Sequence, residues 1–237
     1  MTPITTVLFD CDGVLVDSEV VGLAESARFL RGHGFDWGPD DLVRRFTGMR
    51  QDRFAAALAD AYAEVLGRAP DEAERATLTE GLIEARRRER DTMQLVPGAA
   101  EAVAAARAAG LAVAVASSSA TLYLEDKIDR FGLRPLFGEA VFSADLVAHG
   151  KPAPDIFLHA GKAMGAAPEA CLVIEDSAHG VEAGRAAGMT VWGFTGGGHC
   201  LPDHAEALRE AGAAAVFADH ASLSAALTGT RSSSASV

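Results

Sequence analysis

The chain has 237 residues, 49% of them hydrophobic, so it can bury the core of one large domain or two modest ones. It has 21 lysines and arginines against 33 aspartates and glutamates, and the formal charge of −12 disfavours nonspecific binding to nucleic acid or an anionic membrane. We therefore expect neither nucleic acid nor membrane among its partners. An anionic substrate would have to meet a local positive site.

Cysteine usage and the N-terminal stretch indicate the compartment. Cys11, Cys171 and Cys200 are an odd number without a framework of spacings, which favours a reducing environment over disulfide bonding. The N-terminal stretch lacks a basic region and acids break its apolar run, so it does not predict a signal peptide. No later apolar run reaches membrane-spanning length. The sequence predicts a cytoplasmic protein.

The first predicted element is a short buried strand at residues 4–9, ITTVLF, which is rich in β-branched and aromatic residues. Gly13 indicates a sharp turn after it, so Asp10 and Asp12 lie at a strand's carboxyl end, where open parallel sheets bind ligands. Two such close carboxylates suggest a shared hard cation such as Mg²⁺. With a metal present, an ionised carboxylate is also a nucleophile toward phosphorus. An acidic turn without a ligand is the alternative, and this stretch alone does not decide.

Residues 18–90 carry apolar side chains at spacings of three and four, which is typical of amphipathic helices. Glycines and prolines interrupt the pattern at several places, and no strand is evident. The sequence therefore predicts an all-helical insert of antiparallel hairpins, a candidate second domain.

From Pro97 onward, helices alternate with buried strands. The predicted strands are LAVAVA (111–116), AVF (140–142), CLVI (171–174), MTVWGF (189–194) and AAVF (214–217). This alternation predicts a parallel sheet with right-handed crossovers and helices on both faces. The polar final stretch, TGTRSSSASV, is expected to be disordered.

Polar residues follow three of the later strands. Ser117 can hold a phosphate oxygen, or it can cap a helix. Lys151, in a proline-restricted loop, can neutralise a phosphate and an attacking carboxylate, or it can be an ordinary solvated lysine. Glu175 and Asp176 can complete a metal site with the first acidic pair, or they can cap the helix that starts near Ala178.

Together these motifs resemble the haloacid dehalogenase-like (HAD) hydrolases, in the subgroup with a helical cap inserted after the first motif. The resemblance rests on four motifs in the family's order: the DxD pair, the serine after the second strand, the lysine of a KPxPD loop, and the acidic pair in IEDSAHGVEAGRAAGM. It covers almost the whole chain.

The resemblance implies a fold and its domain limits. The fold would be α/β, with a Rossmann-like parallel sheet core and helices on both faces, plus the inserted all-helical cap. The core would comprise residues 1–16 and 94–228, the cap residues 17–93, and a disordered tail residues 229–237.

The resemblance also implies a division of labour between the two aspartates. Asp10 would attack phosphorus and become an aspartyl phosphate, while Asp12 would protonate the leaving alcohol and then activate water. Asp12 would then need a pKa raised relative to Asp10, whose charge a metal would stabilise. Ser117 and Lys151 would hold the phosphoryl oxygens.

The cofactor implied by the resemblance is Mg²⁺. Its ligands would be Asp10, the backbone carbonyl of Asp12, Asp176 and Glu175. The true dehalogenases of the family attack carbon and need no metal, so this full acidic set favours phosphoryl transfer over dehalogenation.

The family resemblance assigns the choice of substrate to the cap. In FTGMRQDRF, which is similar to the family's substrate-facing loop, Arg50 can reach a hydroxyl, carboxylate or second phosphate; a surface arginine paired with an acid is the alternative. Val14 and the DGVLVDS form resemble the sugar-phosphate phosphatase and β-phosphoglucomutase branch. The mutase carries a histidine ten residues beyond its second aspartate, where this chain has Gly22, which disfavours the mutase.

The sequence therefore predicts a phosphatase for a small phosphorylated metabolite, with a sugar phosphate favoured, acting as a monomer or weak homodimer. The alternatives are a β-phosphoglucomutase-like enzyme and, more remotely, a noncatalytic module resembling a response-regulator receiver. The receiver is disfavoured because its phosphoacceptor follows a later strand and because it lacks a helical insert.

Other patterns are interpreted as structural. The seven histidines show no ligand spacing. The glycines 196–198 of FTGGGHC lack the lysine and spacing of a P-loop, so we interpret them as a mobile loop. Strand alternation should point Cys11 away from the neighbouring aspartates.

Overall fold

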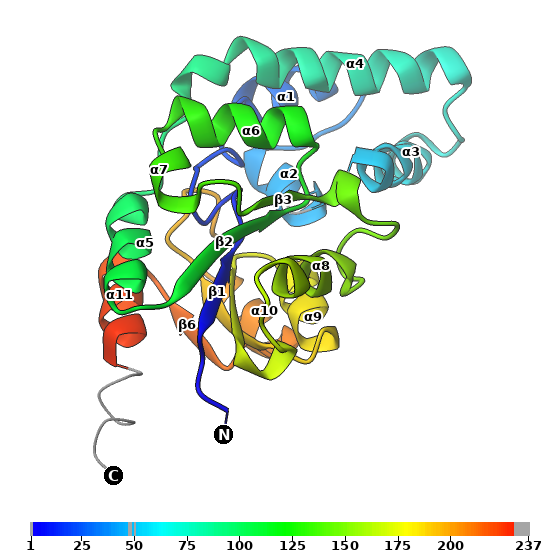
Figure 1. Cartoon of the computed structure of the whole chain (residues 1–237). Coiled ribbons are helices and arrows are strands. Elements are labelled where there is room, and N and C mark those ends of the chain that lie inside the picture. Colours follow the sequence, from blue (N-terminus) through cyan, green and yellow to red (C-terminus); the bar gives the residue numbers. More distant parts are fainter. Residues whose placement is uncertain (1, 47–48, 50, 230–237) are drawn as a thin grey trace. The chain divides into compact units, whose positions relative to one another are not determined.

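The structure is a computed structural model that describes residues 2–46, 49 and 51–229 (Figure 1). It divides into two compact units. We call Met1–Asp17 with Gln94–Val237 the sheet unit, and Ser18–Met93 the helical unit. Of the tail predicted to be disordered, Gly229 ends a helix and residues 230–237 lie outside the described residues.

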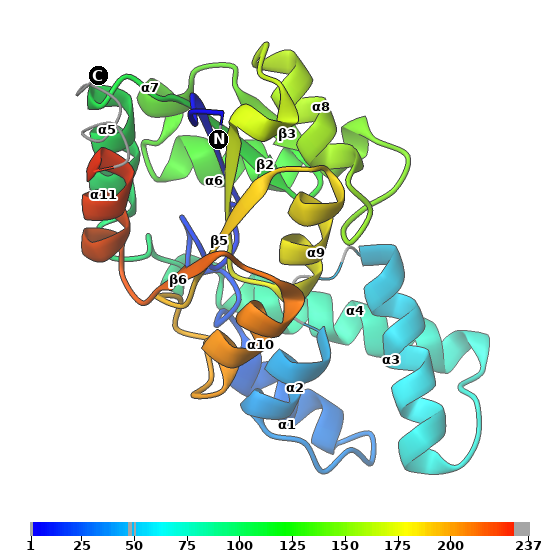
Figure 2. The same cartoon turned by 90° about the horizontal axis from the view of Figure 1, so that it is seen from below.

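The sheet unit is built on six parallel strands in the order β3-β2-β1-β4-β5-β6 (Figures 1 and 2). The strands are β1 (Thr6–Phe9), β2 (Ala112–Ser117), β3 (Val141–Ser143), β4 (Cys171–Glu175), β5 (Thr190–Phe194) and β6 (Ala215–Phe217). This is the Rossmann order, in which the winding direction reverses between β1 and β4 and opens a ligand crevice at their carboxyl ends. The predicted α/β fold is confirmed.

Strand β1 begins two residues later than the sequence predicted. Its first residue, Thr6, pairs with Ala112 on one side and Cys171 on the other, which are the first residues of β2 and β4. Thr5, just before the strand, already hydrogen-bonds Ala170 and Ala112 through its backbone. Because β1 is buried and hydrogen-bonded to a strand on each side, the position of Asp10 at its carboxyl end is fixed.

Helices cover both faces of the sheet (Figures 1 and 2). Helices α8, α9 and α10 pack together on one face; α5 and α11 lie side by side on the other, where α5 also contacts α7. Their bounds are α5 (Ala99–Ala108), α6 (Thr121–Arg130), α7 (Arg134–Phe137), α8 (Asp155–Ala163), α9 (Ala178–Ala186), α10 (His204–Ala211) and α11 (His220–Gly229). Short 3₁₀ helices span Ala144–Leu146 and Pro168–Ala170.

Apolar side chains from the middle of the sheet and from α8 and α9 form one buried cluster. Leu8 of β1, Val173 of β4, Ile156 and Phe157 of α8, and Val181 of α9 are fully buried in it. This packing holds the central strands in place beneath the crevice.

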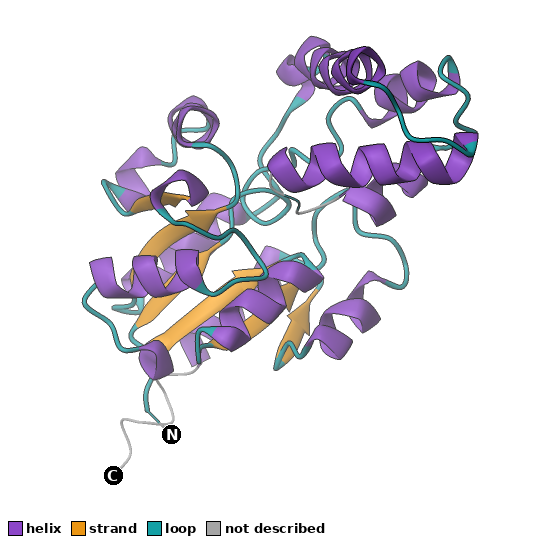
Figure 3. Cartoon of the chain, turned by 90° about the vertical axis from the view of Figure 1, so that its right-hand side faces the viewer, coloured by secondary structure: helices purple, strands orange, loops and turns teal. Residues whose placement is uncertain are grey.

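The helical unit contains helices and loops but no strand among its described residues (Figure 3). Its elements are α1 (Leu23–Arg31), α2 (Pro39–Phe46), α3 (Gln51–Leu66), α4 (Glu72–Arg88) and a 3₁₀ turn (Arg90–Thr92). A separate cluster that includes Leu30, Phe35, Leu58 and Leu78 forms its core. None of the helices in the described segments of the chain has the length and hydropathy needed to cross a bilayer.

We predict that Ile156→Ala lowers the free energy of unfolding by about 2–5 kcal/mol, because it removes a fully buried side chain that the packed sheet cannot replace. Leu158→Ala, two residues along the same helix at a side chain that is 41% exposed, is the matched control and should change it by about 0.5 kcal/mol or less. Urea unfolding measures both. Equal effects of the two substitutions would contradict the assignment of the core.

Candidate active site

The first acidic motif turns sharply as it leaves β1. The backbone amide of Asp10 still donates to the Ile174 carbonyl at 2.9 Å, and the chain then turns at Gly13, which has φ 76°. A Cβ at Gly13 would overlap the Asp176 carboxylate and lie 2.6 Å from Cε1 of His199. Only glycine fits there, and the turn brings the two acidic motifs together.

Lys151 lies between these motifs. Its Nζ donates to Asp10 Oδ1 and to Glu175 Oε1, both at 2.6 Å, and to the Ala116 carbonyl at 3.3 Å. The side chain is only 3% exposed. Burial acts to lower the pKa of Lys151, but the Asp10 and Glu175 carboxylates raise it above its ordinary value. The ammonium therefore stays charged in the crevice.

The second acidic pair divides its contacts. Both oxygens of Glu175 are engaged, because Oε2 accepts from Ser177 N at 2.8 Å and Oγ at 2.9 Å while Oε1 accepts from Lys151. Asp176 is buried beside it, and carboxylate oxygens of Asp10, Glu175 and Asp176 lie within 4.8 Å of one another. This donor set suits a hard divalent cation.

The charge on Asp10 depends on its surroundings. Burial raises its pKa well above the ordinary value; Lys151 acts against this, while Glu175, Asp176 and Asp12 raise the pKa further. Asp10 is the more deeply buried of the two aspartates, with 7% of its side chain exposed against 18% for Asp12. The expected order of their pKa values applies with a metal bound to Asp10 and stays a prediction.

Asp12 contacts a lysine that the sequence analysis did not assign to the site. Lys127 Nζ donates to Asp12 Oδ1 and, at 3.0 Å, to Ser119 Oγ. Ser119 Oγ and Ser117 Oγ donate to Asp12 Oδ2 at 2.7 Å and 3.3 Å. Lys127 and the two serines therefore hold the Asp12 carboxylate in a fixed orientation.

A pattern in the sequence could have identified Lys127. It lies on the buried face of α6 with Leu124 and Ile128 and is itself 8% exposed. A lysine among the apolar positions of an amphipathic helix requires a buried acidic partner.

Ser117 ends β2 as expected and does not cap α6, whose N-cap is Ala120 without a side-chain hydrogen bond. Arg50 lies outside the described residues.

The loop after β5, predicted to be mobile, is anchored in the structure. Gly198 N donates to Asp17 Oδ1 at 3.1 Å, and His199 is buried with its Nε2 2.9 Å from Asp176 Oδ2. Burial acts to lower the pKa of His199, but Asp176 and Cys200 raise it to about 11. This contact was not predicted from the sequence, where the histidines were expected to be structural.

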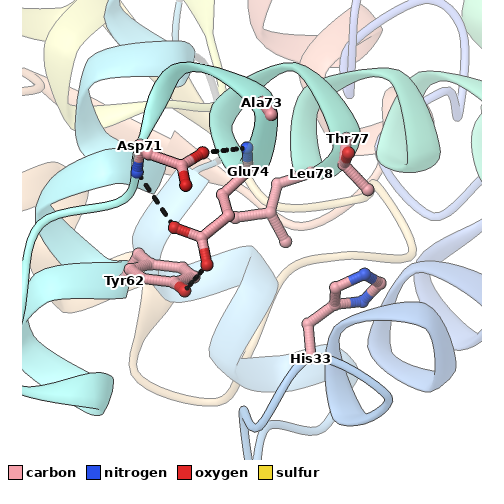
Figure 4. Close-up of a pocket in the computed structure, with 7 residues that line it drawn as sticks. All are labelled: His33, Tyr62, Asp71, Ala73, Glu74, Thr77 and Leu78. Atoms are coloured by element: carbon pink, nitrogen blue, oxygen red, sulfur yellow. Dashed lines mark hydrogen bonds between the residues drawn. The ribbon is translucent and has the colours of Figure 1, made fainter.

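A cavity of about 360 Å³ lies within the helical unit. It is lined by His33, Tyr62, Asp71, Ala73, Glu74, Thr77 and Leu78 (Figure 4). Glu74 accepts from the Tyr62 hydroxyl at 2.7 Å and from Asp71 N at 2.9 Å, and Asp71 accepts from Glu74 N at 2.8 Å. The last two bonds form the capping box that starts α4. These polar groups serve the helix rather than a ligand.

Comparison with known proteins identifies the family. A family model described as haloacid dehalogenase-like hydrolase matches residues 4–188. The chain belongs to this family. The predicted resemblance is confirmed, and this HAD-like chain is accordingly an enzyme of the hydrolase class.

Two curated relatives of this HAD-like hydrolase differ in how much they share with it. The protein SUPPRESSOR OF QUENCHING 1, chloroplastic, of Arabidopsis thaliana is 36% identical over 186 residues, which are 78% of this chain but 17% of that protein. The chain therefore spans less than a fifth of that relative. Hexitol phosphatase B of Escherichia coli (strain K12) is 31% identical over 186 residues, which are 78% of this chain and 81% of that protein.

A solved structure of a HAD family hydrolase from Deinococcus radiodurans R1, with bound phosphate and sodium, is also similar to this chain. It is 36% identical, has a TM-score of 0.79, and the match covers 97% of each chain.

We predict that Asp10→Asn changes how stability depends on pH in metal-free buffer. The folded-state pKa of Asp10 lies above the unfolded value of about 3.9, so this proton stabilises the fold below that pH and the contribution is lost as pH rises through the raised pKa. The asparagine variant should therefore gain free energy of unfolding relative to wild type as the pH rises from about 4 toward 8, with a slope of at most about 1.4 kcal/mol per pH unit.

Urea unfolding at each pH measures this difference. Glu139→Gln, which alters an exposed carboxylate of the sheet unit, is the control and should show no such trend. A pH-independent difference between Asp10→Asn and wild type would contradict the raised pKa.

Proposed function

We propose that this chain is a Mg²⁺-dependent phosphatase that hydrolyses a small phosphorylated metabolite, with a sugar phosphate as the favoured class, through an aspartyl phosphate at Asp10. The observation that carries the proposal is the Asp10 carboxylate held by the buried ammonium of Lys151 at the reversal point of the sheet. A relative named hexitol phosphatase B and a similar structure with bound phosphate support it.

The residues present fit a magnesium ion. A buried group of three carboxylates faces a single lysine, and burial keeps the pKa of Asp10 high in the absence of a cation. Asp10, Asp176 and the backbone carbonyl of Asp12 would hold the ion. Glu175, whose oxygens already accept from Lys151 and Ser177, would orient the lysine. When bound, the ion would neutralise charge on the carboxylates and the substrate phosphate.

In the proposed first step, an Asp10 oxygen attacks phosphorus and the bond to the leaving oxygen breaks. Lys151 Nζ is placed to stabilise the charge that develops on the phosphoryl oxygens, because it already donates to Asp10. Ser117 Oγ, at the end of β2, would donate to a phosphoryl oxygen on binding. Positioning and electrostatics thus do most of the work.

The proton needed by the leaving oxygen would come from the pair formed by Asp12 and Lys127, which are in contact. In the second step, water attacks the phosphorus of the aspartyl phosphate and releases inorganic phosphate, and its proton returns to the same pair. Ser117 and Ser119 hold the Asp12 carboxylate in orientation for both transfers.

The mutase alternative is disfavoured by the backbone of the helical unit. Gly22, where the mutase resemblance requires a histidine, has φ 70°, and a Cβ there would lie 2.7 Å from the Arg86 Cα. A histidine at this position would be strained and would clash with α4. Membership in a hydrolase family likewise favours an enzyme over a receiver-like module.

We further propose that residues 17–93 act as the cap that selects the substrate, with Arg50 contacting it, and that residues 1–16 and 94–228 carry the chemistry. The described residues of Ser18–Met93 form helices and loops without a strand, which supports this division. The three cysteines are free, which supports the proposed cytoplasmic location.

We predict that wild type releases phosphate from at least one sugar phosphate in a panel, and that EDTA abolishes release until Mg²⁺ is restored. Asp10→Asn should lower kcat by about 10³-fold or more, because it removes the nucleophile. Phosphate release measures all three effects, with Glu139→Gln as a control that should match wild type. Conversion of β-glucose 1-phosphate to its isomer, without phosphate release, would favour the mutase instead.

We predict that Lys127→Met lowers kcat by about 10²-fold and changes the pH profile of kcat, with a smaller effect on KM, because it removes the cation that contacts Asp12. Lys162→Met, at an exposed lysine of α8, is the matched control. Steady-state kinetics from pH 5 to 9 distinguish the two variants. An unchanged pH profile in Lys127→Met would mean that the lysine is only structural.

A further inference from the structure

A second cluster of potential metal ligands lies next to the acidic one. Nitrogen or sulfur atoms of His199, Cys200 and His204 lie within 4.8 Å of one another. Cys200 Sγ is 3.7 Å from His199 Nε2, and a ring nitrogen of His204 lies within 4.8 Å of both other ligand atoms. The three side chains thus converge on one point.

The local chain geometry produces this convergence. His199 and Cys200 lie in the loop after β5, and His204 is the first residue of α10. The two histidines have the His-x₄-His spacing, which falls within the range common in zinc sites, so the expectation that the histidines show no ligand spacing was wrong for this pair. Zinc binds sulfur at about 2.3 Å and imidazole nitrogen at about 2.0–2.1 Å, so two tetrahedral ligands lie about 3.5 Å apart. The observed 3.7 Å between sulfur and nitrogen needs little adjustment.

The chemistry of the cluster differs from that of the acidic site. A thiol and two imidazoles suit Zn²⁺, Co²⁺ or another borderline divalent ion, whereas the oxygen ligands of the acidic site suit Mg²⁺. Two of the three ligands are partly exposed to solvent, Cys200 and His204, whereas His199 is buried. A cation can therefore reach it from solvent.

The two clusters meet at Asp176. His199 Nε2 lies 2.9 Å from Asp176 Oδ2, and His204 Nε2 contacts the Asp176 backbone oxygen. The Asp176 carboxylate adds negative charge beside the cluster. Because it contacts the same His199 nitrogen that faces the sulfur, a cation bound there would replace this contact. One imidazole is enough to pair with the Asp176 carboxylate. A salt bridge therefore does not explain why a thiol and a second imidazole lie at the same place.

We propose that His199, Cys200 and His204 form a second metal site, selective for Zn²⁺ or a similar borderline divalent cation and distinct from the magnesium site proposed above. The cation binds the sulfur as thiolate and the two imidazoles as neutral ligands, so binding releases the thiol proton and any proton on the rings. A fourth position remains for water.

Cobalt titration of the full-length protein in saturating Mg²⁺ tests the site, because Co²⁺ reports a bound thiolate by its charge-transfer absorption. Wild type should bind one equivalent with this band, and Zn²⁺ should displace it. Cys200→Ser should lose the band, and His204→Ala should bind about tenfold or more weakly. Cys171→Ala, at a buried cysteine of β4, is the matched control and should retain the band.

Asp10→Asn separates this proposal from the phosphatase proposal, since it should keep the cobalt band while losing activity. Alkylation of Cys200 in wild type, read by peptide mass, is a second measurement that needs no variant, and Zn²⁺ should protect the thiol. No band in wild type, a band that persists in a folded Cys200→Ser, or equal alkylation with and without Zn²⁺ would overturn the proposal.

Discussion

The ammonium of Lys151, buried between Asp10 and Glu175, is the interaction on which the crevice depends. Removing one partner of a buried ion pair leaves an uncompensated charge, typically at a cost of about 3–5 kcal/mol. The three groups come from β1, from the end of β4 and from the loop before α8, so the sheet must be correctly paired before they meet. The same arrangement gathers several carboxylates in a small buried volume, and that excess of negative charge favours a divalent cation. A bound cation, together with Lys151, would then attract an anionic substrate.

Each aspartate of the first motif has a different environment, and this separates their proposed tasks. Asp10 is buried among carboxylates with one lysine, which suits a nucleophile that ionises fully when a cation is bound. Asp12 contacts Lys127 and two serines, which suits a group that exchanges a proton. On the other side of Asp176, imidazoles and a thiol replace oxygen ligands. One carboxylate thus separates two donor sets that prefer different metals.

Much of this could be predicted from the sequence, because the informative residues follow buried strands directly. The β1, β2 and β4 patterns predicted the parallel sheet and placed Asp10, Ser117 and Asp176 at one edge. Lys127 was missed because it lies within helix α6 rather than directly after a strand, so its contact with Asp12 depends on how that helix packs. The contact of His199 with Asp176 was missed for a similar reason. A loop of glycines gives no periodicity, and the two side chains meet beside Gly13 only in the folded chain.

The covalent intermediate at Asp10 tests the central claim most directly. Wild type is mixed with a phosphorylated substrate in Mg²⁺, quenched within the first turnover and reduced with borohydride, which converts an acyl phosphate to an alcohol. The account predicts that the peptide containing Asp10 carries this change at Asp10 and that the quenched sample lacks it when substrate is omitted. Phosphate release at full rate with Asp10 unmodified at every quench time would contradict it.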